Sequence, residues 1–91
     1  MAGLKTTFIR ATIASGGTPQ QLSSAFNAAR KVVFKCPFAN AGLVKLGLTG
    51  FTSAYFTLER GESIELEHLD LSTIYGDGTT DDEVEVIVLH D

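Results

Sequence analysis

Short runs in which apolar and polar residues alternate restrict the fold of this chain more than any other feature of its sequence. Such a period of two is typical of β-strands that bury one face and expose the other. The clearest runs are residues 30–38, 63–69 and 83–89. The predicted core faces of these runs consist of Val32, Phe34, Cys36 and Phe38, of Ile64, Leu66 and His68, and of Val84, Val86 and Val88. The opposite face of the last run turns apolar at Ile87 and Leu89, which predicts burial on both faces there.

Two further runs predict additional strands. Residues 5–14 are rich in β-branched residues, and Phe8 stands out of phase with Ile9. Residues 43–48 follow the turn sequence ANAG, so we expect them to form a hairpin with the run at residues 30–38. Turn signals recur at intervals of about 8–12 residues, without the spacing of βαβ units. The sequence therefore predicts an all-β fold, a small jelly-roll-like β-sandwich of about six to eight short antiparallel strands.

One segment, residues 18–30, also fits a helix. Thr18, Pro19 and Gln21 have the order of a capping box. The serines and asparagine that follow are weak helix formers. We therefore predict at most one short helix, of one or two turns, with an irregular crossover as the alternative.

The length of 91 residues corresponds to one domain. We predict a single β-sandwich domain over residues 1–91, with residues 1–7 as a candidate N-terminal arm that adds a strand to a neighbour. Cys36 is the only cysteine, so no disulfide forms within the chain. The first residues lack an uninterrupted apolar segment, which predicts synthesis in the cytoplasm without export by a signal peptide. No stretch approaches the ~20 apolar residues of a membrane span.

Charge is distributed unevenly along the chain. A net charge of −4 and an isoelectric point near 5.0 argue against nucleic acid and anionic membranes as partners. All Lys and Arg except Arg60 lie at or before Lys45, whereas the acids concentrate in the second half. Two interpretations stay open: the basic part of one copy faces the acidic part of another, or both parts are simply solvated.

The segment IYGDGTTDDEVEVIVL, residues 74–89, sets acids around two glycines. In an EF-hand register that begins at Asp77, Asp82 falls where glycine is required and Val88 where a bidentate Glu is required, so that template fails. Asp and Gly are also the residues that hairpin loops favour. We therefore predict an exposed turn whose acids keep its tip in water. A looser cation site formed by Asp77, Asp81 and Asp82 stays open as the alternative.

No pattern in the sequence predicts catalysis. Cys36 lies on the apolar face of a predicted strand, where a lone cysteine usually packs as a small core residue. His68 is expected in the core and His90 near the end of the sequence, and with one cysteine they cannot form a closed zinc site within one chain. Neither a P-loop nor a G-x-S-x-G motif occurs. We therefore expect a protein that is not an enzyme, with no catalytic residues, no metal site and no cofactor.

The densest aromatic group is Phe51, Tyr55 and Phe56. Three interpretations stay open for it: one end of the core, a subunit contact, or a platform on which sugars stack. We take these three rings and two residues near the start of the chain as candidate interface residues. The set is Leu4, Lys5, Phe51, Tyr55 and Phe56.

From Ala29 to Leu89 the order of elements resembles a group of small virion proteins of tailed bacteriophages. The matching pieces are an Asn-x-Gly turn with a short strand after it, a L-x-x-G-E-S-I-x-L segment, a D-L-S-x-I-Y element and a closing valine-rich strand. They correspond here to Asn40 to Gly42, Leu43 to Gly47, Leu58 to Leu66, Asp70 to Tyr75 and Val84 to Leu89.

This resemblance implies a structural protein of the virion, with no catalytic residues. Proteins of this kind are often β-sandwiches that decorate or cement a capsid, frequently as trimers. The expected partner is then the major capsid protein, the expected state a homo-oligomer with a trimer favoured, and the expected location the capsid surface. A neck, tail or fibre-base component is the alternative within the virion, and a carbohydrate-binding module is the alternative outside it.

Overall fold

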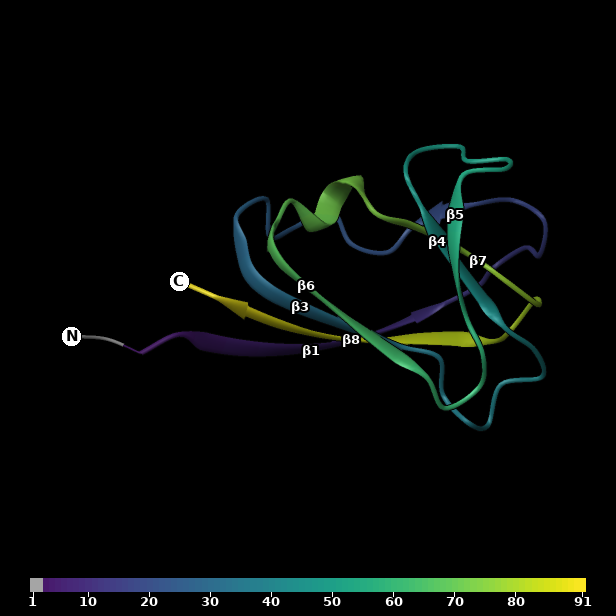
Figure 1. Ribbon diagram of the computed structural model, residues 1–91, viewed down its shortest axis with the longest axis horizontal. Helices are drawn as coiled ribbons and strands as arrows, with labels where there is room; N and C mark the ends of the chain where they lie inside the picture. The colour runs from purple at the N-terminus through teal and green to yellow at the C-terminus, as the bar shows by residue number, and fades with distance from the viewer. Residues whose placement is uncertain (1–2) are drawn as a thin grey trace.

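The computed structural model describes residues 3–91, and these form eight β-strands in two antiparallel sheets (Figure 1). The main sheet has the strand order β1-β8-β3-β6 and the second sheet the order β2-β7-β4-β5. The elements are β1 (Lys5–Thr12), β2 (Gln20–Gln21), β3 (Ala29–Lys35), β4 (Val44–Gly47), β5 (Tyr55–Leu58), β6 (Ser63–Leu69), the 3₁₀ turn η1 (Leu71–Thr73), β7 (Tyr75–Asp77) and β8 (Glu83–His90).

The strand pairs are nested, which is the topology of a jelly roll. β1 pairs with β8, β2 with β7, β3 with β6 and β4 with β5, as if one long hairpin had been rolled into two layers. The pairing of β3 with β8 joins the strand pairs of the main sheet, and the pairing of β4 with β7 joins those of the second sheet. The predicted all-β, jelly-roll-like sandwich is therefore confirmed.

The core lies between the two sheets and is built by the alternation that the sequence predicts. From the main sheet, Val32, Phe34 and the three valines of β8 point inward and are at most 1% exposed. From the second sheet, Val44, Leu46 and Leu58 face them. Cys36 extends the inward face of β3 and is also fully buried, as predicted.

The predicted hairpin between residues 30–38 and 43–48 is wrong, because β3 and β4 belong to different sheets. Pro37 lacks the N–H that would continue the ladder, and β3 ends just before it. The connection is then fixed by Asn40, whose side chain donates to the Glu83 carbonyl (2.8 Å) and accepts from the Glu83 N–H (2.9 Å). Asn40 thus guides the chain from one layer to the other.

Residues 18–28 form an irregular crossover with the two-residue strand β2, and no helix forms there. The side chain of Gln20 donates to the Thr12 carbonyl and accepts from the Ala14 N–H, which ties the crossover to the end of β1. The short helical turn of the structure lies instead at η1, where Asp70 Oδ1 accepts from the Ser72 N–H at 3.0 Å. Local side-chain hydrogen bonds therefore determine the conformation of both segments.

Three residues are more exposed than predicted. Phe38 is 76% exposed because β3 ends at Lys35 and the chain turns away. His68 is exposed because its φ of 51° interrupts the alternation of β6. Ile87 is half-buried rather than buried, because within residues 3–91 no second layer covers the outer face of the main sheet.

The candidate arm, residues 1–7, overlaps β1, because Lys5, Thr6 and Thr7 pair with β8. Met1 and Ala2 lie outside the described residues. Within residues 3–91, no helix has the length and apolar character needed to cross a bilayer.

Candidate functional site

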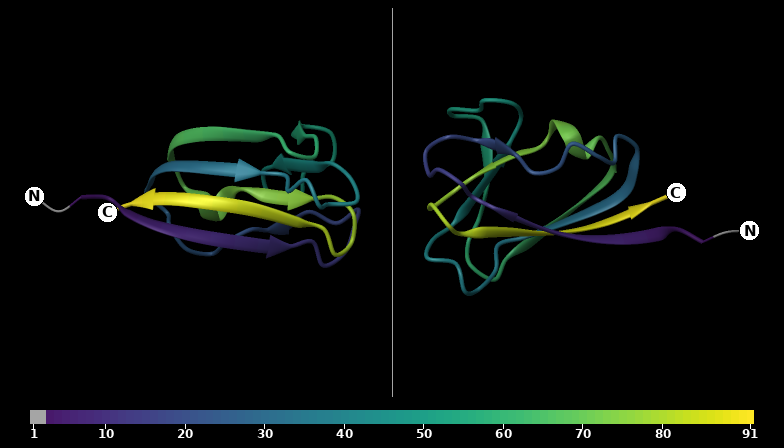
Figure 2. Two further views of the ribbon diagram at one scale, coloured as in Figure 1. Left: turned by 90° about the horizontal axis from the view of Figure 1, so that it is seen from below. Right: turned by 180° about the vertical axis from the view of Figure 1, so that it is seen from behind.

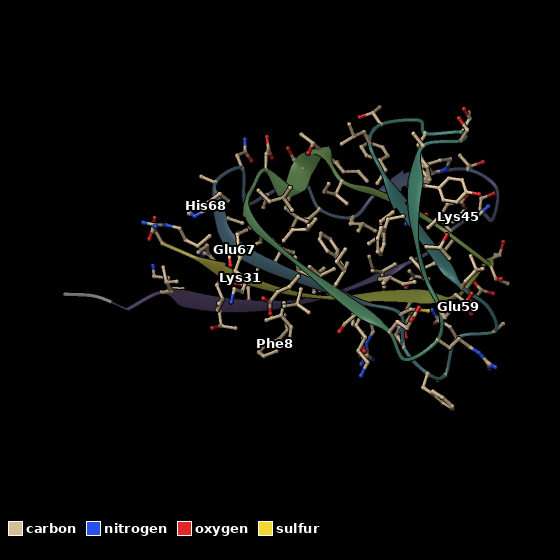
Figure 3. The ribbon with its side chains drawn as sticks, in the orientation of Figure 1. Phe8, Lys31, Lys45, Glu59, Glu67 and His68 are labelled. Carbon is tan, nitrogen blue, oxygen red and sulfur yellow. The ribbon has the colours of Figure 1, made fainter. Side chains whose placement is uncertain are left out.

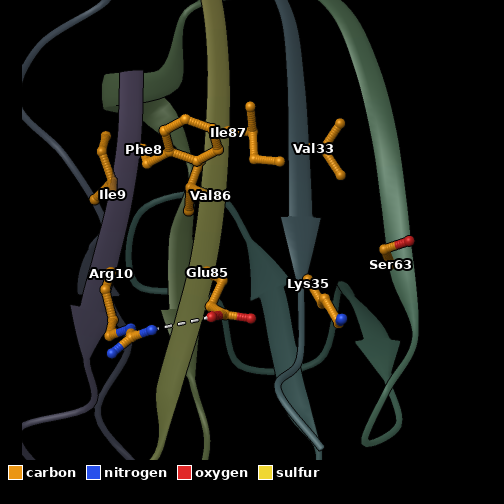
Figure 4. Close-up of a pocket in the computed structure, with 9 residues that line it drawn as sticks. All are labelled: Phe8, Ile9, Arg10, Val33, Lys35, Ser63, Glu85, Val86 and Ile87. Carbon is orange, nitrogen blue, oxygen red and sulfur yellow. Dashed lines mark hydrogen bonds and ion pairs between the residues drawn. The ribbon is translucent and has the colours of Figure 1, made fainter. Parts of the chain in front are cut away.

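The outer face of the main sheet carries apolar side chains in a row across three strands. The strand register places Phe8 of β1 beside Ile87 of β8, and Ile87 beside Val33 of β3 (Figure 4). These three residues are the outer-face stripe. Phe8 is 76% exposed and projects away from the second sheet (Figure 3). An aromatic side chain of this size gains much free energy when a partner covers it.

Charged residues border the stripe along both sides. On one side, Arg10 donates to Glu85 at 3.3 Å, and Lys35 lies in the next strand. On the other side, Lys31 forms an ion pair with Glu65 at 3.5 Å. The stripe lines a shallow hollow of about 600 Å³ together with Arg10, Glu85 and Lys35. An apolar centre with a charged rim is the usual anatomy of a protein-binding surface.

A second apolar surface opens along the side of the sandwich where β5 and β6 form the sheet edges. This open-side groove has a volume of about 330 Å³. Phe34 and Leu46 lie at its base, and Phe56, Leu48 and Ile64 stand at its rim. Phe56 is in register with Leu46 and belongs to the inner face of β5, yet it is 54% exposed. The two layers therefore do not close over each other on this side.

The three predicted aromatic residues do not share one surface. Phe56 and Tyr55 both line the open-side groove, although they belong to opposite faces of β5, and Phe51 does not line it. The Tyr55 ring lies 5.7 Å from the Phe51 ring, and the Lys45 ammonium lies 4.8 Å from its centroid (Figure 3 labels Lys45). Phe51 in turn packs over Gly47 and is half-buried. Of the other candidate interface residues, Leu4 is 50% exposed and Lys5 is exposed on β1.

Two acids of the predicted wet turn are buried, so that part of the prediction is wrong. Asp82 is 7% exposed, and its two oxygens accept from the N–H groups of Ala41 (2.8 Å) and Gly42 (3.0 Å). Asp77 is 8% exposed and accepts from Gly17 and from Gly78. These carboxylates fasten loops that are far apart in the sequence.

The third acid, Asp81, is exposed and has a φ of 74°, a conformation that Asp tolerates in turns. Within residues 3–91, no group of three His, Cys, Asp or Glu side chains is arranged to hold a metal ion. The turn between β7 and β8 is thus a structural clamp with one exposed acid.

Cys36 lies in a closed environment. Its Sγ is 3.4 Å from Asn40 Nδ2 and 3.6 Å from the Gly42 carbonyl. Burial, above all, raises the pKa of the thiol, so the nucleophilic thiolate is disfavoured. His90, the other candidate for chemistry, packs on the Phe26 ring at 4.6 Å, and its Nε2 lies 2.9 Å from Thr7 Oγ1.

The outer-face stripe is not among the surfaces that the sequence predicts. A signal for it exists, since Phe8 is out of phase with Ile9, and Val33 and Ile87 lie opposite the core faces of their runs. The signal is incomplete because the sequence does not show which strands are neighbours in the sheet. Two other apolar residues are exposed, Leu48 and Phe38, and their exposure too is visible only in the tertiary structure.

No protein-family model matches the sequence, and no curated protein matches it. Among solved structures, the chain is similar to one from Bacillus described as "Bacillus endospore appendages form a novel family of disulfide-linked pili". The TM-score is 0.50 at 11% sequence identity, over 100% of this chain and 92% of the other. At this identity the similarity shows a shared fold.

Proposed function

We propose that this protein is a non-enzymatic structural subunit that works by binding neighbouring subunits in a larger protein assembly. The outer-face stripe is the observation that carries this proposal. Phe8, Val33 and Ile87 form a continuous apolar row on a sheet face that has no second layer. Burying such a row in an interface contributes roughly 25 cal/mol per Å² of apolar surface, and the ion pairs around it fix the orientation of the partner.

The shared fold adds support of a general kind. The Bacillus protein is a subunit of pili, so this fold is used elsewhere to build an extended assembly. Those pili are described as disulfide-linked. In the present chain the single cysteine, Cys36, is fully buried, so we propose that its assembly is non-covalent.

The specific assembly that we propose is a phage virion, in which the protein is a decoration or cement subunit on the capsid surface. The outer-face stripe would lie on the major capsid protein, and a trimer would bridge adjacent capsid subunits. Binding to the assembled shell stabilises it by mass action, because the free energy of binding is lost when the shell comes apart. The resemblance of residues 29–89 to small virion proteins supports this form of the proposal.

Two alternatives use other surfaces or locations. A neck, tail or fibre-base subunit would use the same stripe against a different partner. A carbohydrate-binding module would need aromatic faces open to a sugar, and the Tyr55 ring has Lys45 on it and Phe51 beside it. Tyr55 and Phe56 both line the open-side groove, but the contacts of the Tyr55 ring with Lys45 and Phe51 compete with a sugar, which favours the structural proposal over the carbohydrate one.

A pair of matched variants tests the proposal, since Phe8 and Phe38 are equally exposed at 76%. The assay is co-sedimentation with empty shells made from the major capsid protein of a tailed phage that carries this gene. Phe8→Ser should weaken binding by at least about tenfold, because it removes the only aromatic side chain of the stripe. Phe38→Ser, which lies outside the stripe, should bind like the wild type. Equal binding by both variants, or no binding by the wild type, would contradict the capsid form of the proposal.

A further inference from the structure

The main sheet has two long edges without a partner strand in the described chain. β1 and β6 lie at its two margins (Figure 2, left), with lengths of eight and seven residues. The edge strands of the second sheet, β2 and β5, have only two and four residues. A long regular edge strand presents unpaired backbone N–H and C=O groups and therefore tends to pair with another strand.

The two long edges carry charges of opposite sign. No acidic residue precedes Glu59, so β1 has only Lys5 and Arg10, whereas β6 has only Glu65 and Glu67. Pairing of β1 with β1, or of β6 with β6, would concentrate like charges and is disfavoured. Pairing of β1 with β6 brings opposite charges together.

The direction of the strands also permits such a contact. Every pairing in the main sheet is antiparallel, and three successive pairings lead from β1 to β6, so these two strands run in opposite directions. A second copy shifted sideways, without being turned over, therefore places its β1 antiparallel to β6 of the first copy. The sheet then continues with its regular hydrogen-bond pattern.

One register satisfies both faces of the joined sheet. Placing Arg10 opposite Glu65 on the outer face aligns Lys5, which lies five positions earlier and therefore on the other face of β1, with Asp70, the residue after the end of β6. Asp70 Oδ1 accepts from Ser72, which leaves Oδ2 for the lysine. Arg10 keeps its bond to Glu85 and still has donors to spare, since its side chain is 64% exposed.

On the inner face, the same register sets Ile9 opposite Leu66 and Ala11 opposite Ile64. All four are partly buried and pack against the core at its two edges. A shift of two residues one way puts Arg10 opposite Ser63. The same shift the other way pairs Arg10 with Glu67, but it puts Ile9 opposite His68 and Lys5 opposite Ser72 in place of Asp70. The register with Arg10 opposite Glu65 is therefore favoured over both neighbours.

We propose that this chain assembles with copies of itself by antiparallel pairing of β1 with β6 of the next copy, with Arg10 opposite Glu65 and Lys5 opposite Asp70. The contact is heterologous, so repeated use generates a ring or a filament. The outer faces of successive copies then form one surface, which brings their outer-face stripes side by side. The inference rests on the proposed function and specifies how copies of the subunit meet.

Cysteine cross-linking tests the pairing and the register together. Thr12 and Ser63 are exposed and fall opposite each other in the proposed register. Within one molecule they lie on opposite edges of a four-stranded sheet, about 14 Å apart or more, too far for a disulfide. A mixture of Thr12→Cys and Ser63→Cys proteins, oxidised at about 0.5 mM to capture a weak contact, should therefore give a covalent dimer only through the β1–β6 contact.

The controls separate this contact from random collision. Wild-type protein, with its buried Cys36, is the blank. Each single variant alone reports pairing of like edges, and Thr6→Cys mixed with Ser63→Cys reports a wrong register. Dimer in the first mixture, several times above all four controls, is the expected result. Equal dimer in any control, or none in the mixture, overturns the inference.

Sedimentation velocity gives an independent measurement on the same contact. Lys5→Glu should weaken self-association about tenfold, because it places like charges together, whereas Lys35→Glu on the central strand β3 should not. Wild-type protein that stays monomeric up to about 1 mM overturns the inference. Binding to shells and its dependence on Phe8 would then still decide the proposed function separately.

Discussion

Single side chains hold the loops of this sandwich at positions that the sequence pattern does not reveal. Asp82 bonds two backbone N–H groups of the connection between β3 and β4, and Asn40 of that connection bonds both backbone groups of Glu83. The two loops are thus locked to each other from both sides. A buried carboxylate is tolerated here because each of its oxygens accepts a hydrogen bond.

Replacing Asp82 by Asn tests this clamp. The amide has one accepting oxygen, so one of the two N–H groups loses its acceptor and meets an NH₂ group instead. We expect the free energy of unfolding to fall by about 1–3 kcal/mol, measured by urea denaturation. Asp81→Asn is the matched control, since Asp81 is exposed and Asn also tolerates its positive φ, and it should change stability by less than about 0.5 kcal/mol. Similar losses in both variants would contradict the clamp.

At the residue scale, the faces of Val32, Phe34 and the β8 valines follow from the sequence because alternation depends only on neighbouring positions. The burial of Asp82 does not, because its donors lie about forty positions earlier in the chain. The local sequence, with acids near Gly and Thr residues, is typical of a solvent-exposed turn. It carries no sign of the distant N–H groups that bury Asp82.

At the scale of elements, the long strands are predictable and their partners are not. β1, β3, β6 and β8 all follow from alternating runs. β2 and β7, with two and three residues, are too short to show a period. The order ANAG between two runs is typical of a hairpin, but Pro37 ends the ladder and Asn40 bonds to β8, so the chain crosses to the other sheet.

The pair β4 and β5 depends on a close approach at Gly47. A Cβ at this position would lie 2.7 Å from Cγ of the Phe51 ring and 3.0 Å from the Ala54 carbonyl oxygen. Gly47→Ala should therefore displace the loop and lower the free energy of unfolding by about 1–3 kcal/mol, as measured by thermal or urea denaturation. Gly3→Ala is the control, because nothing lies within 4 Å of a Cβ there. An unchanged stability of Gly47→Ala would show that the loop gives way freely.

At the scale of the whole molecule, the jelly roll converts an uneven charge distribution along the sequence into a polar sheet. The first strand and the sixth become the two margins of the main sheet, so one margin carries Lys5 and Arg10 and the other carries Glu65 and Glu67. The outer-face stripe lies between those margins. The sequence shows the charge imbalance, but only the strand order shows where each charge lies.

Hydroxyl-radical footprinting tests the central claim, that the protein acts as an assembly subunit through its outer-face stripe, because it compares two equally exposed rings within one molecule. Phe8 and Phe38 are each 76% exposed in the free protein and should be oxidised to similar extents. In protein sedimented with shells, we predict that oxidation of Phe8 falls severalfold while that of Phe38 stays unchanged. Unchanged oxidation of Phe8 in the sedimented protein, or equal protection of both rings, would contradict the claim.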